Sequence, residues 1–297
     1  MPVSTRLIKR RIKSIQNTRK ITKAMELVAA SKMKRAIQLA MTSRAYAATA
    51  RTLVDDIMHL ADPATHAMLT GTRVQKEHAR TLLVICSSDR GLCGGFNSQI
   101  IKYAIEFAKS RNEENVSIIA IGKQAARAAK RAGLKTIATF ESISSAPSFL
   151  AARPIGTLAV DEFVSHHVDR VFIAYTNFHS AMSQDPMVEQ ILPIIPEDYL
   201  DATRSKNQQG MISQVVFEPN PKAVLNILLP KLVKTRIYQA LLESAASEHS
   251  ARMVAMQSAT ENATSMVDGL TLSFNQARQA LITQEISEIS AGKAAIE

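Results

Sequence analysis

Two long stretches without glycine or proline, one near each end, constrain this chain more than any other feature. Residues 3–62 and residues 231–268 contain neither amino acid, and the second pattern resumes after Gly269. Glycine costs roughly 1 kcal/mol and proline roughly 3 kcal/mol in a helix interior, so both stretches are expected to be helical. Ser4 can cap the first helix. At about 1.5 Å per residue each helix would be roughly 90 Å long, far beyond the usual length of a core helix.

Small and apolar side chains recur at spacings of three and four along both stretches, which is typical of a coiled-coil seam. The first seam consists of Ile8, Ile12, Ile15, Ala29, Met33, Ala36, Ala40, Ser43, Ala47, Ala50, Val54 and Ile57. The second consists of His249, Met253, Met256, Thr260, Ala263, Val267, Leu270, Phe274, Ala277 and Leu281. Two matched helices at opposite ends of one chain are expected to pair as an antiparallel coiled coil.

Polar residues interrupt the first seam. They are Arg19, Thr22 and Glu26. A second stripe is expected to continue the packing there on a shifted face, and it consists of Ile21, Met25 and Val28. The alternative is that both long helices are ordinary core helices of a bundle, and their length argues against it.

The middle of the chain changes period. Continuous apolar runs predict strands at 81–86, 116–121, 136–140 and 171–175, and helical patterns lie between them near 97–110, 123–132 and 155–167. Alternating strands and helices predict a parallel sheet in an α/β fold. Two later runs, 188–195 and 215–217, are candidate edge strands, and the prolines in and after the first confine it to an edge.

The predicted fold class is therefore α/β plus a long antiparallel α-helical coiled coil, with a Rossmann-like α/β domain inserted between the paired terminal helices. The predicted boundaries are 1–62 for the N-terminal helix, 75–220 for the α/β domain and 222–297 for the C-terminal helix. No apolar run approaches the roughly 20 residues that a membrane-spanning helix needs.

The positive charge is concentrated in the first sixth of the chain. The formal net charge is +10, and residues 1–51 carry thirteen lysines and arginines against the single acid Glu26. Such a segment is expected to meet an acidic partner, which can be nucleic acid, an anionic membrane surface or an acidic protein. An arginine-rich, acid-poor segment is also typical of a mitochondrial transit peptide, but the helical pattern continues past any plausible cleavage point.

The loop 87–96 follows the first predicted strand and precedes a helix, which is where a phosphate loop would lie. It has neither the lysine and hydroxyl of a Walker motif nor the spacing of a dinucleotide fingerprint, so a tight turn is the favoured interpretation. Neither the two cysteines nor the seven histidines show metal-ligand spacing, and no nucleophile motif occurs. We therefore predict no catalytic, cofactor-binding or metal-binding residue.

Four stretches carry a resemblance to a known family. Lys20–Met33, Asp89–Gly95, Ser247–Met256 and Ala277–Ile286 resemble signature stretches of the gamma subunit of the F-type ATP synthase, in order and over the whole chain. The inserted pair of regulatory cysteines of the plant chloroplast form is not present, so thiol control is not expected.

The resemblance implies a non-catalytic rotary shaft that binds no nucleotide. The paired helices would turn inside a ring of three alpha and three beta subunits, beside the epsilon subunit and on the ring of c subunits, and so couple proton flow to ATP synthesis or hydrolysis. It also implies peripheral membrane association on the cytoplasmic side of a bacterial plasma membrane. The competing hypothesis is a basic coiled-coil protein that binds nucleic acid, although no groove-reading motif supports it.

The resemblance also implies which side chains contact the alpha and beta ring. Those at the matching motif positions are Lys20, Lys23, Met25, Arg252, Arg278, Gln279 and Thr283. Arg10 and Arg11 would extend the basic face that meets acidic beta loops. Plain solvation is the alternative for each basic residue, because exposed ion pairs contribute only about 0–1 kcal/mol. Coiled-coil packing is the alternative for Met25.

Overall fold

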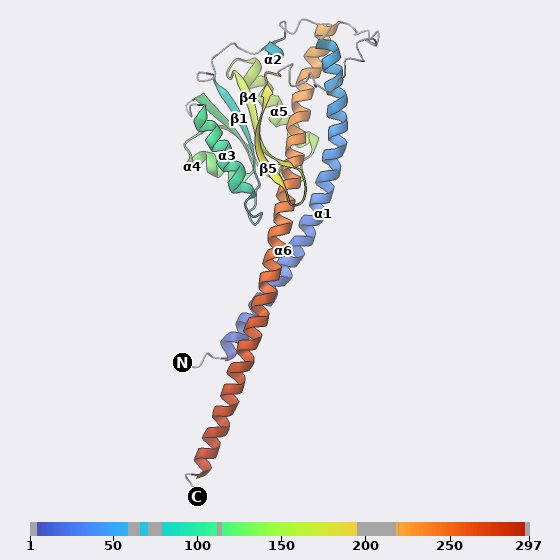
Figure 1. The fold of residues 1–297 in the computed structure, drawn as a ribbon. Coiled ribbons are helices and arrows are strands. Elements are labelled where there is room, and N and C mark those ends of the chain that lie inside the picture. Colours follow the sequence, from blue (N-terminus) through green and yellow to red (C-terminus); the bar gives the residue numbers. More distant parts are fainter. Residues whose placement is uncertain are drawn as a thin grey trace. The chain divides into compact units, whose positions relative to one another are not determined.

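Two long helices open and close the chain (Figure 1). The computed structural model describes residues 5–58, 66–70, 79–111, 115–194, 218 and 220–294. Helix α1 is Thr5–Met58 and helix α6 is Pro221–Ala294. Both predicted long helices are confirmed, and α6 begins before the predicted stretch and continues through Pro230. The short helix α2, Ala67–Thr70, precedes the sheet in the chain.

The part of the chain between the two long helices contains five strands, which form one sheet. The strands are β1 (Thr81–Cys86), β2 (Val116–Ile121), β3 (Lys135–Phe140), β4 (Arg170–Phe178) and β5 (Gln184–Leu192), and their spatial order is β3-β2-β1-β4-β5. The first four are parallel, and β5 runs antiparallel to β4 at the edge. The α/β prediction and the edge position of the proline-flanked run are therefore confirmed. The candidate strand 215–217 lies outside the described residues.

Three further helices connect the strands. They are α3 (Phe96–Ser110), α4 (Lys123–Arg131) and α5 (Phe149–Val164). The prediction of 155–167 for α5 is wrong at both ends. The helix begins earlier because the Ser148 hydroxyl caps it by accepting the Ala151 N–H at 3.2 Å, and Pro154 is tolerated inside. It ends earlier because the backbone at His166 turns left-handed, with φ 55°.

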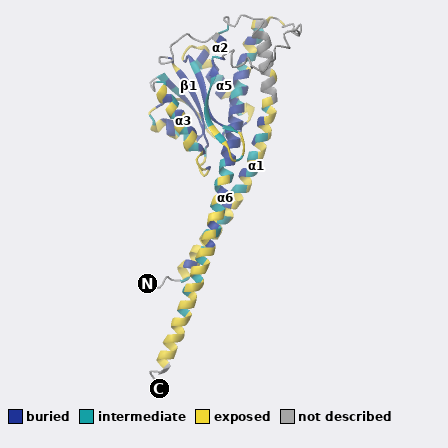
Figure 2. Cartoon of the chain, in the orientation of Figure 1, coloured by how far each residue is buried: buried dark blue, intermediate teal, exposed yellow. Residues whose placement is uncertain are grey.

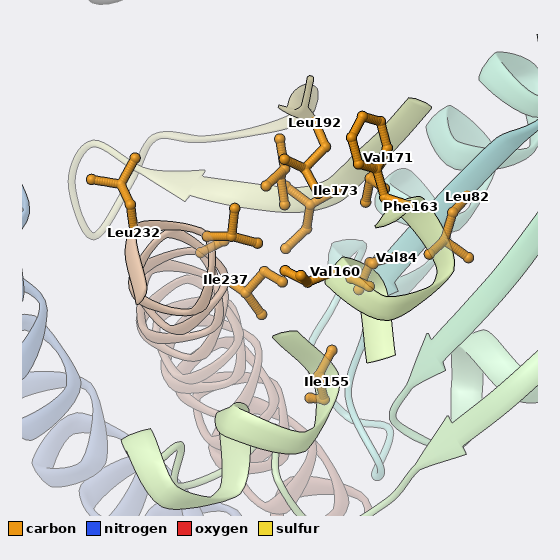
Figure 3. Close-up of a cluster of buried hydrophobic side chains, with 14 of the residues drawn as sticks. Leu82, Val84, Ile155, Val160, Phe163, Val171, Ile173, Leu192, Leu232 and Ile237 are labelled. Carbon is orange, nitrogen blue, oxygen red and sulfur yellow. The ribbon is translucent and has the colours of Figure 1, made fainter. Parts of the chain in front are cut away.

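The sheet is covered on both faces, each with its own core. One face packs against α3 and α4 through residues such as Ile100, Ala104 and Ala125. The other face packs against α5 and the first part of α6, as Figure 3 shows. The α6 residues on that face are spaced along one stripe and include Leu225, Leu229, Leu232, Val233 and Ile237. The first part of α6 is therefore a core helix of the α/β domain.

A polar contact adds to this packing where α6 meets the edge strand. The Arg236 guanidinium donates from Nε and Nη2 to the Glu189 carboxylate of β5, and the Nε to Oε1 distance is 2.9 Å. The Tyr175 hydroxyl of β4 donates to the same carboxylate at 3.2 Å. Each hydrogen bond of this kind to a charged group contributes about 1.5–3 kcal/mol, so the contact fixes β5 against the helix.

The residue contacts divide the chain into two units, one of Met1–Ala30 with Arg252–Glu297 and one of Ser31–Ala251. Within the first, the Thr260 hydroxyl donates to the Thr22 hydroxyl at 2.8 Å. Within the second, Ala36 packs against Ala245 and Ala246. Higher numbers in α1 thus meet lower numbers in α6, which confirms the antiparallel pairing. The three predicted domain boundaries stay a prediction.

The second apolar stripe proposed for α1 is wrong at two of its three positions, because only Met25 is partly buried. Ile21 is 60% exposed and Val28 is 57% exposed, whereas Thr22 is only 8% exposed and lies in the seam. A threonine can occupy this position because its hydroxyl also donates to the Arg19 carbonyl at 3.0 Å and so stays hydrogen-bonded. The seam positions named from the sequence are buried or partly buried wherever the structure describes their side chains.

The helix pairing can be tested with an engineered disulfide between Ile12 and Leu270. The Thr22–Thr260 contact, extended ten residues along each antiparallel helix, places these two side chains opposite each other. We expect the pair Ile12→Cys and Leu270→Cys to cross-link rapidly within the full chain on mild oxidation, as judged by gel mobility. The matched control replaces Leu270→Cys by Leu272→Cys, whose native side chain is 61% exposed. Equal cross-linking of both pairs would contradict the register.

Gly122, between β2 and α4, closes the turn where the chain approaches β1. Its φ is +86°, and a Cβ built there would lie 2.4 Å from the Ser87 carbonyl oxygen. Gly133, which follows α4, also has a positive φ, +70°, but a Cβ there would meet nothing within 4 Å. A side chain at either glycine would strain the backbone, but only a side chain at Gly122 would also clash with backbone atoms.

Alanine substitutions at these two glycines should differ in cost. We expect Gly122→Ala to lower the free energy of unfolding by about 3 kcal/mol or more, because the clash is with backbone and cannot relax by a rotamer change. Gly133→Ala should cost only about 1–2 kcal/mol, the usual cost of a left-handed alanine. Urea denaturation of the full chain measures both values. Equal losses would mean that the close approach to Ser87 has no energetic role.

Candidate functional site

The glycine-rich turn after β1 lies at the carboxyl ends of the parallel strands, where α/β folds bind ligands. The Asp89 carboxylate fills this position from within the chain. Its Oδ1 accepts the Lys123 N–H at 3.2 Å, at the N-terminus of α4. Its Oδ2 accepts the Ser142 N–H and the Ser144 hydroxyl, each at 3.0 Å. A carboxylate thus occupies the place that a phosphate would take at this helix end.

A second set of contacts closes the same turn. Ser88 is buried, and its N–H donates to Asn97 Oδ1 at 3.0 Å. The Asn97 amide donates in turn to the Ser88 hydroxyl at 2.7 Å and to Cys93 Sγ at 3.1 Å. Burial raises the pKa of the nearby Cys86 thiol, so this cysteine is a packed, unreactive residue. These hydrogen bonds hold a tight turn between β1 and α3, which is the interpretation that the sequence favoured.

The described part of the chain holds neither a metal-binding cluster nor a membrane-spanning helix. Among those residues no group of three or more histidine, cysteine, aspartate or glutamate side chains could hold a metal ion. No helix within the same residues is long and apolar enough to cross a membrane.

The candidate contact residues of α1 lie along one exposed basic helix. Lys20 is exposed, as are Arg10 and Arg11. Lys23 is also exposed, and its ammonium pairs with Glu26 Oε1 at 2.8 Å, which partly neutralises it. Met25 is partly buried, so the structure leaves both a packing role and a contact role open to it.

The candidate contact residues of α6 differ in burial. Arg252 is partly buried, whereas Arg278, Gln279 and Thr283 are exposed. Gln279 and Thr283 are four residues apart on a continuous helix, so they share one face and can form a small polar patch. Arg252 lies about 39 Å along the helix axis from Arg278, at about 1.5 Å per residue. The seven predicted residues are therefore spread along two helices, and the structure does not gather them into one pocket.

Exposed apolar side chains lie next to several of these residues, and the sequence reasoning had placed two of those on α1, Ile21 and Val28, in a packed stripe. On α1, Ile21, Leu27 and Val28 are 60%, 60% and 57% exposed. On the last part of α6, Ile282, Ile286 and Ile289 are 47%, 60% and 73% exposed. Grouped exposed apolar side chains typically mark a protein interface. Their positions off the heptad seam were the available signal, because such positions cannot pack between the two helices.

Comparison with known proteins gives the same family from three directions. A family model described as ATP synthase matches residues 4–296. The ATP synthase gamma chain of Heliobacterium modesticaldum is 41% identical over 97% of this chain and 98% of its own length. That of Alkaliphilus metalliredigens is 39% identical over the full length of both.

Solved structures agree with this assignment. A chain in the central stalk and c-ring structure of the Tetrahymena thermophila mitochondrial ATP synthase covers 80% of this chain, with a TM-score of 0.61 and 26% identity. A chain of the Euglena gracilis mitochondrial ATP synthase covers 99%, with a TM-score of 0.67, and at 20% identity it supports the fold alone. With a match over nearly every residue and full-length relatives near 40% identity, the chain belongs to the ATP synthase gamma-chain family.

Proposed function

We propose that this chain is the central rotary shaft of an F-type ATP synthase, which couples rotation of a membrane c-ring to ATP synthesis or hydrolysis at the beta subunits. The observation that carries the proposal is the full-length match to gamma chains together with two long helices paired antiparallel through small side chains. Uninterrupted helices in close contact resist twisting, which a shaft requires. The Tetrahymena structure, a central stalk with its c-ring, supports the same role.

The chain's own part in this reaction is mechanical. The Asp89 carboxylate accepts the Lys123 N–H and the Ser142 N–H, so a side chain of this protein already occupies the anion position at the N-terminus of α4. In this proposal, ATP is made or hydrolysed at the beta subunits. The shaft would favour a different conformation in each beta subunit by making different contacts with each. The c-ring would hold the chain at the membrane as a peripheral protein, on the cytoplasmic side in a bacterium.

The partner contacts that we propose follow the charges and exposed side chains. Lys20 and Lys23 on α1 would meet acidic loops of the beta subunits as they pass, next to the exposed apolar side chains of the same helix. On α6, Arg252, Arg278, Gln279 and Thr283 would form hydrogen bonds to loops of the alpha and beta ring. Three alpha and three beta subunits, the epsilon subunit and the c-ring complete the proposed assembly.

The competing function, a basic coiled-coil protein that binds nucleic acid, receives no support from the comparisons. The relatives and the structures named above carry ATP synthase names. The basic face of α1 instead fits an acidic protein partner, because exposed apolar side chains lie beside its lysines and arginines.

The proposal can be tested by purification and reconstitution of the complex with Arg278→Ala and Gln279→Ala. Tagged wild-type chain is expected to purify with three alpha and three beta subunits. Both variants should assemble as well as wild type, because alanine favours helix and both side chains are exposed. In vesicles, ATP-driven proton pumping and ATP synthesis should fall. A hydrogen bond to a charged group contributes about 1.5–3 kcal/mol, enough to change the balance between beta conformations tenfold or more.

The control for this experiment is Gln276→Ala, at an exposed glutamine that lies about one turn before Gln279 on α6 and outside the signature stretch. It should leave pumping and synthesis unchanged. Wild-type coupling in the Arg278 and Gln279 variants would make both residues ordinary surface positions. Loss of assembly would make their role structural, and a wild-type chain that brings down no alpha or beta subunits would overturn the shaft function itself.

A further inference from the structure

One segment of α6 is buried on all sides. Residues 239–250 are buried without a break. Figure 2 shows dark blue along the part of α6 beside the sheet. A helix at a protein surface normally buries one stripe and exposes the rest, so continuous burial requires neighbours in every direction. Seven of these twelve residues are polar or charged. They are Gln239, Glu243, Ser244, Ser247, Glu248, His249 and Ser250.

Helix α1 holds one side of this segment. The Arg44 guanidinium donates to Glu243 Oε1 from Nη2 at 2.9 Å and from Nε at 3.2 Å. The Gln239 amide donates to the same oxygen at 3.2 Å. Glu243 is 5% exposed, so breaking these contacts would leave a buried carboxylate without its cation.

Strand β4 and the hairpin that follows it hold a second side. The Ser247 hydroxyl donates to the Thr176 carbonyl of β4 at 3.2 Å. The Ser250 hydroxyl donates to the Ala181 carbonyl in the hairpin turn at 2.7 Å and accepts from the Gln184 amide at 3.2 Å. Both serines are completely buried.

The loop between β3 and α5 holds a third side. His249 Nε2 lies 3.0 Å from the Ser145 carbonyl oxygen. A carbonyl only accepts, so this ring nitrogen carries the proton and donates. At about 100° per residue, the side chains of His249 and Ser250 leave the helix about 200° and 300° round from Ser247. The hydrogen bonds therefore fix α6 from directions that a single packed face could not supply.

We propose that residues 243–250, here called the clamp segment, hold α6 against rotation about its own axis, so that torque passes between the α/β domain and the helix at this level. A turn of the helix by one residue would take Ser247, His249 and Ser250 off their backbone acceptors at the same time. The clamp segment ends next to Ala251, where the second unit of the chain ends. The inference rests on the proposed shaft function, and it assigns Ser247, His249 and Ser250 as positioning residues for coupling.

The test compares variants that remove these donors with variants that keep them. The double variant Ser247→Ala with Ser250→Ala deletes two hydroxyls with little change in volume. His249→Leu removes the donor, whereas His249→Gln can return an amide N–H to the position of Nε2. Ser258→Ala, at an exposed serine of α6 beyond the clamp segment, is the matched control.

Two readouts on the assembled, vesicle-reconstituted complex decide the outcome. The first is amide hydrogen exchange of residues 243–250, which should rise about fivefold for each neutral hydrogen bond lost. The second is the number of protons pumped per ATP hydrolysed, which should fall in the double variant and in His249→Leu. His249→Gln and Ser258→Ala should match wild type in both. The glutamine rescue distinguishes positioning by a hydrogen bond from mere filling of space.

Faster exchange with an unchanged pumping ratio would overturn the clamp, because the helix would then be looser without loss of coupling. Unchanged exchange in the double variant would overturn it as well. These outcomes differ from failure of the shaft function, in which the wild-type chain itself would assemble no pumping complex. If His249→Leu does not fold, the double serine variant still decides the question.

Discussion

Helix α6 belongs to two structures at once, and the rest of the fold depends on this. Its first part is a core helix of the α/β domain, where Leu225, Leu229 and Ile237 pack on the sheet. The same unbroken helix continues to Ala294 and pairs with α1. A domain joined through a flexible linker could not drive a shaft. Here the joint is a continuous helix whose side chains change partners along its length, from leucine and isoleucine on the sheet to alanine and threonine against α1.

Small side chains explain how the two long helices approach closely. Ala36 meets Ala245 and Ala246, and Thr22 meets Thr260, so the helices are in contact through short side chains at these two levels. Some large apolar side chains off the seam are instead exposed, as at Leu27 and Ile289. Grouped side chains of this kind typically mark an interface, and they agree with the proposed place of the chain inside a ring of partner subunits.

Most of the fold could be predicted because its signals are local. Continuous apolar runs marked β1 and β2 to the residue, and the absence of glycine and proline marked both long helices. Two predictions were wrong because a polar side chain forms a local hydrogen bond with the backbone. Thr22 can lie in the seam because its hydroxyl donates to the Arg19 carbonyl. Helix α5 begins earlier than predicted because the Ser148 hydroxyl caps it. The hydrogen-bond partners of Ser247, His249 and Ser250 could not be predicted, because they are carbonyls from strands and loops distant in sequence.

The central claim is that this chain turns within its complex, and observation of single complexes tests it most directly. A bead can be attached at Lys102→Cys on α3, where the native side chain is 77% exposed and both natural cysteines are buried. With the beta subunits fixed to a surface, the account predicts continuous rotation in one direction when ATP is supplied, and none without it. A bead that stays still while the same complexes hydrolyse ATP would contradict it.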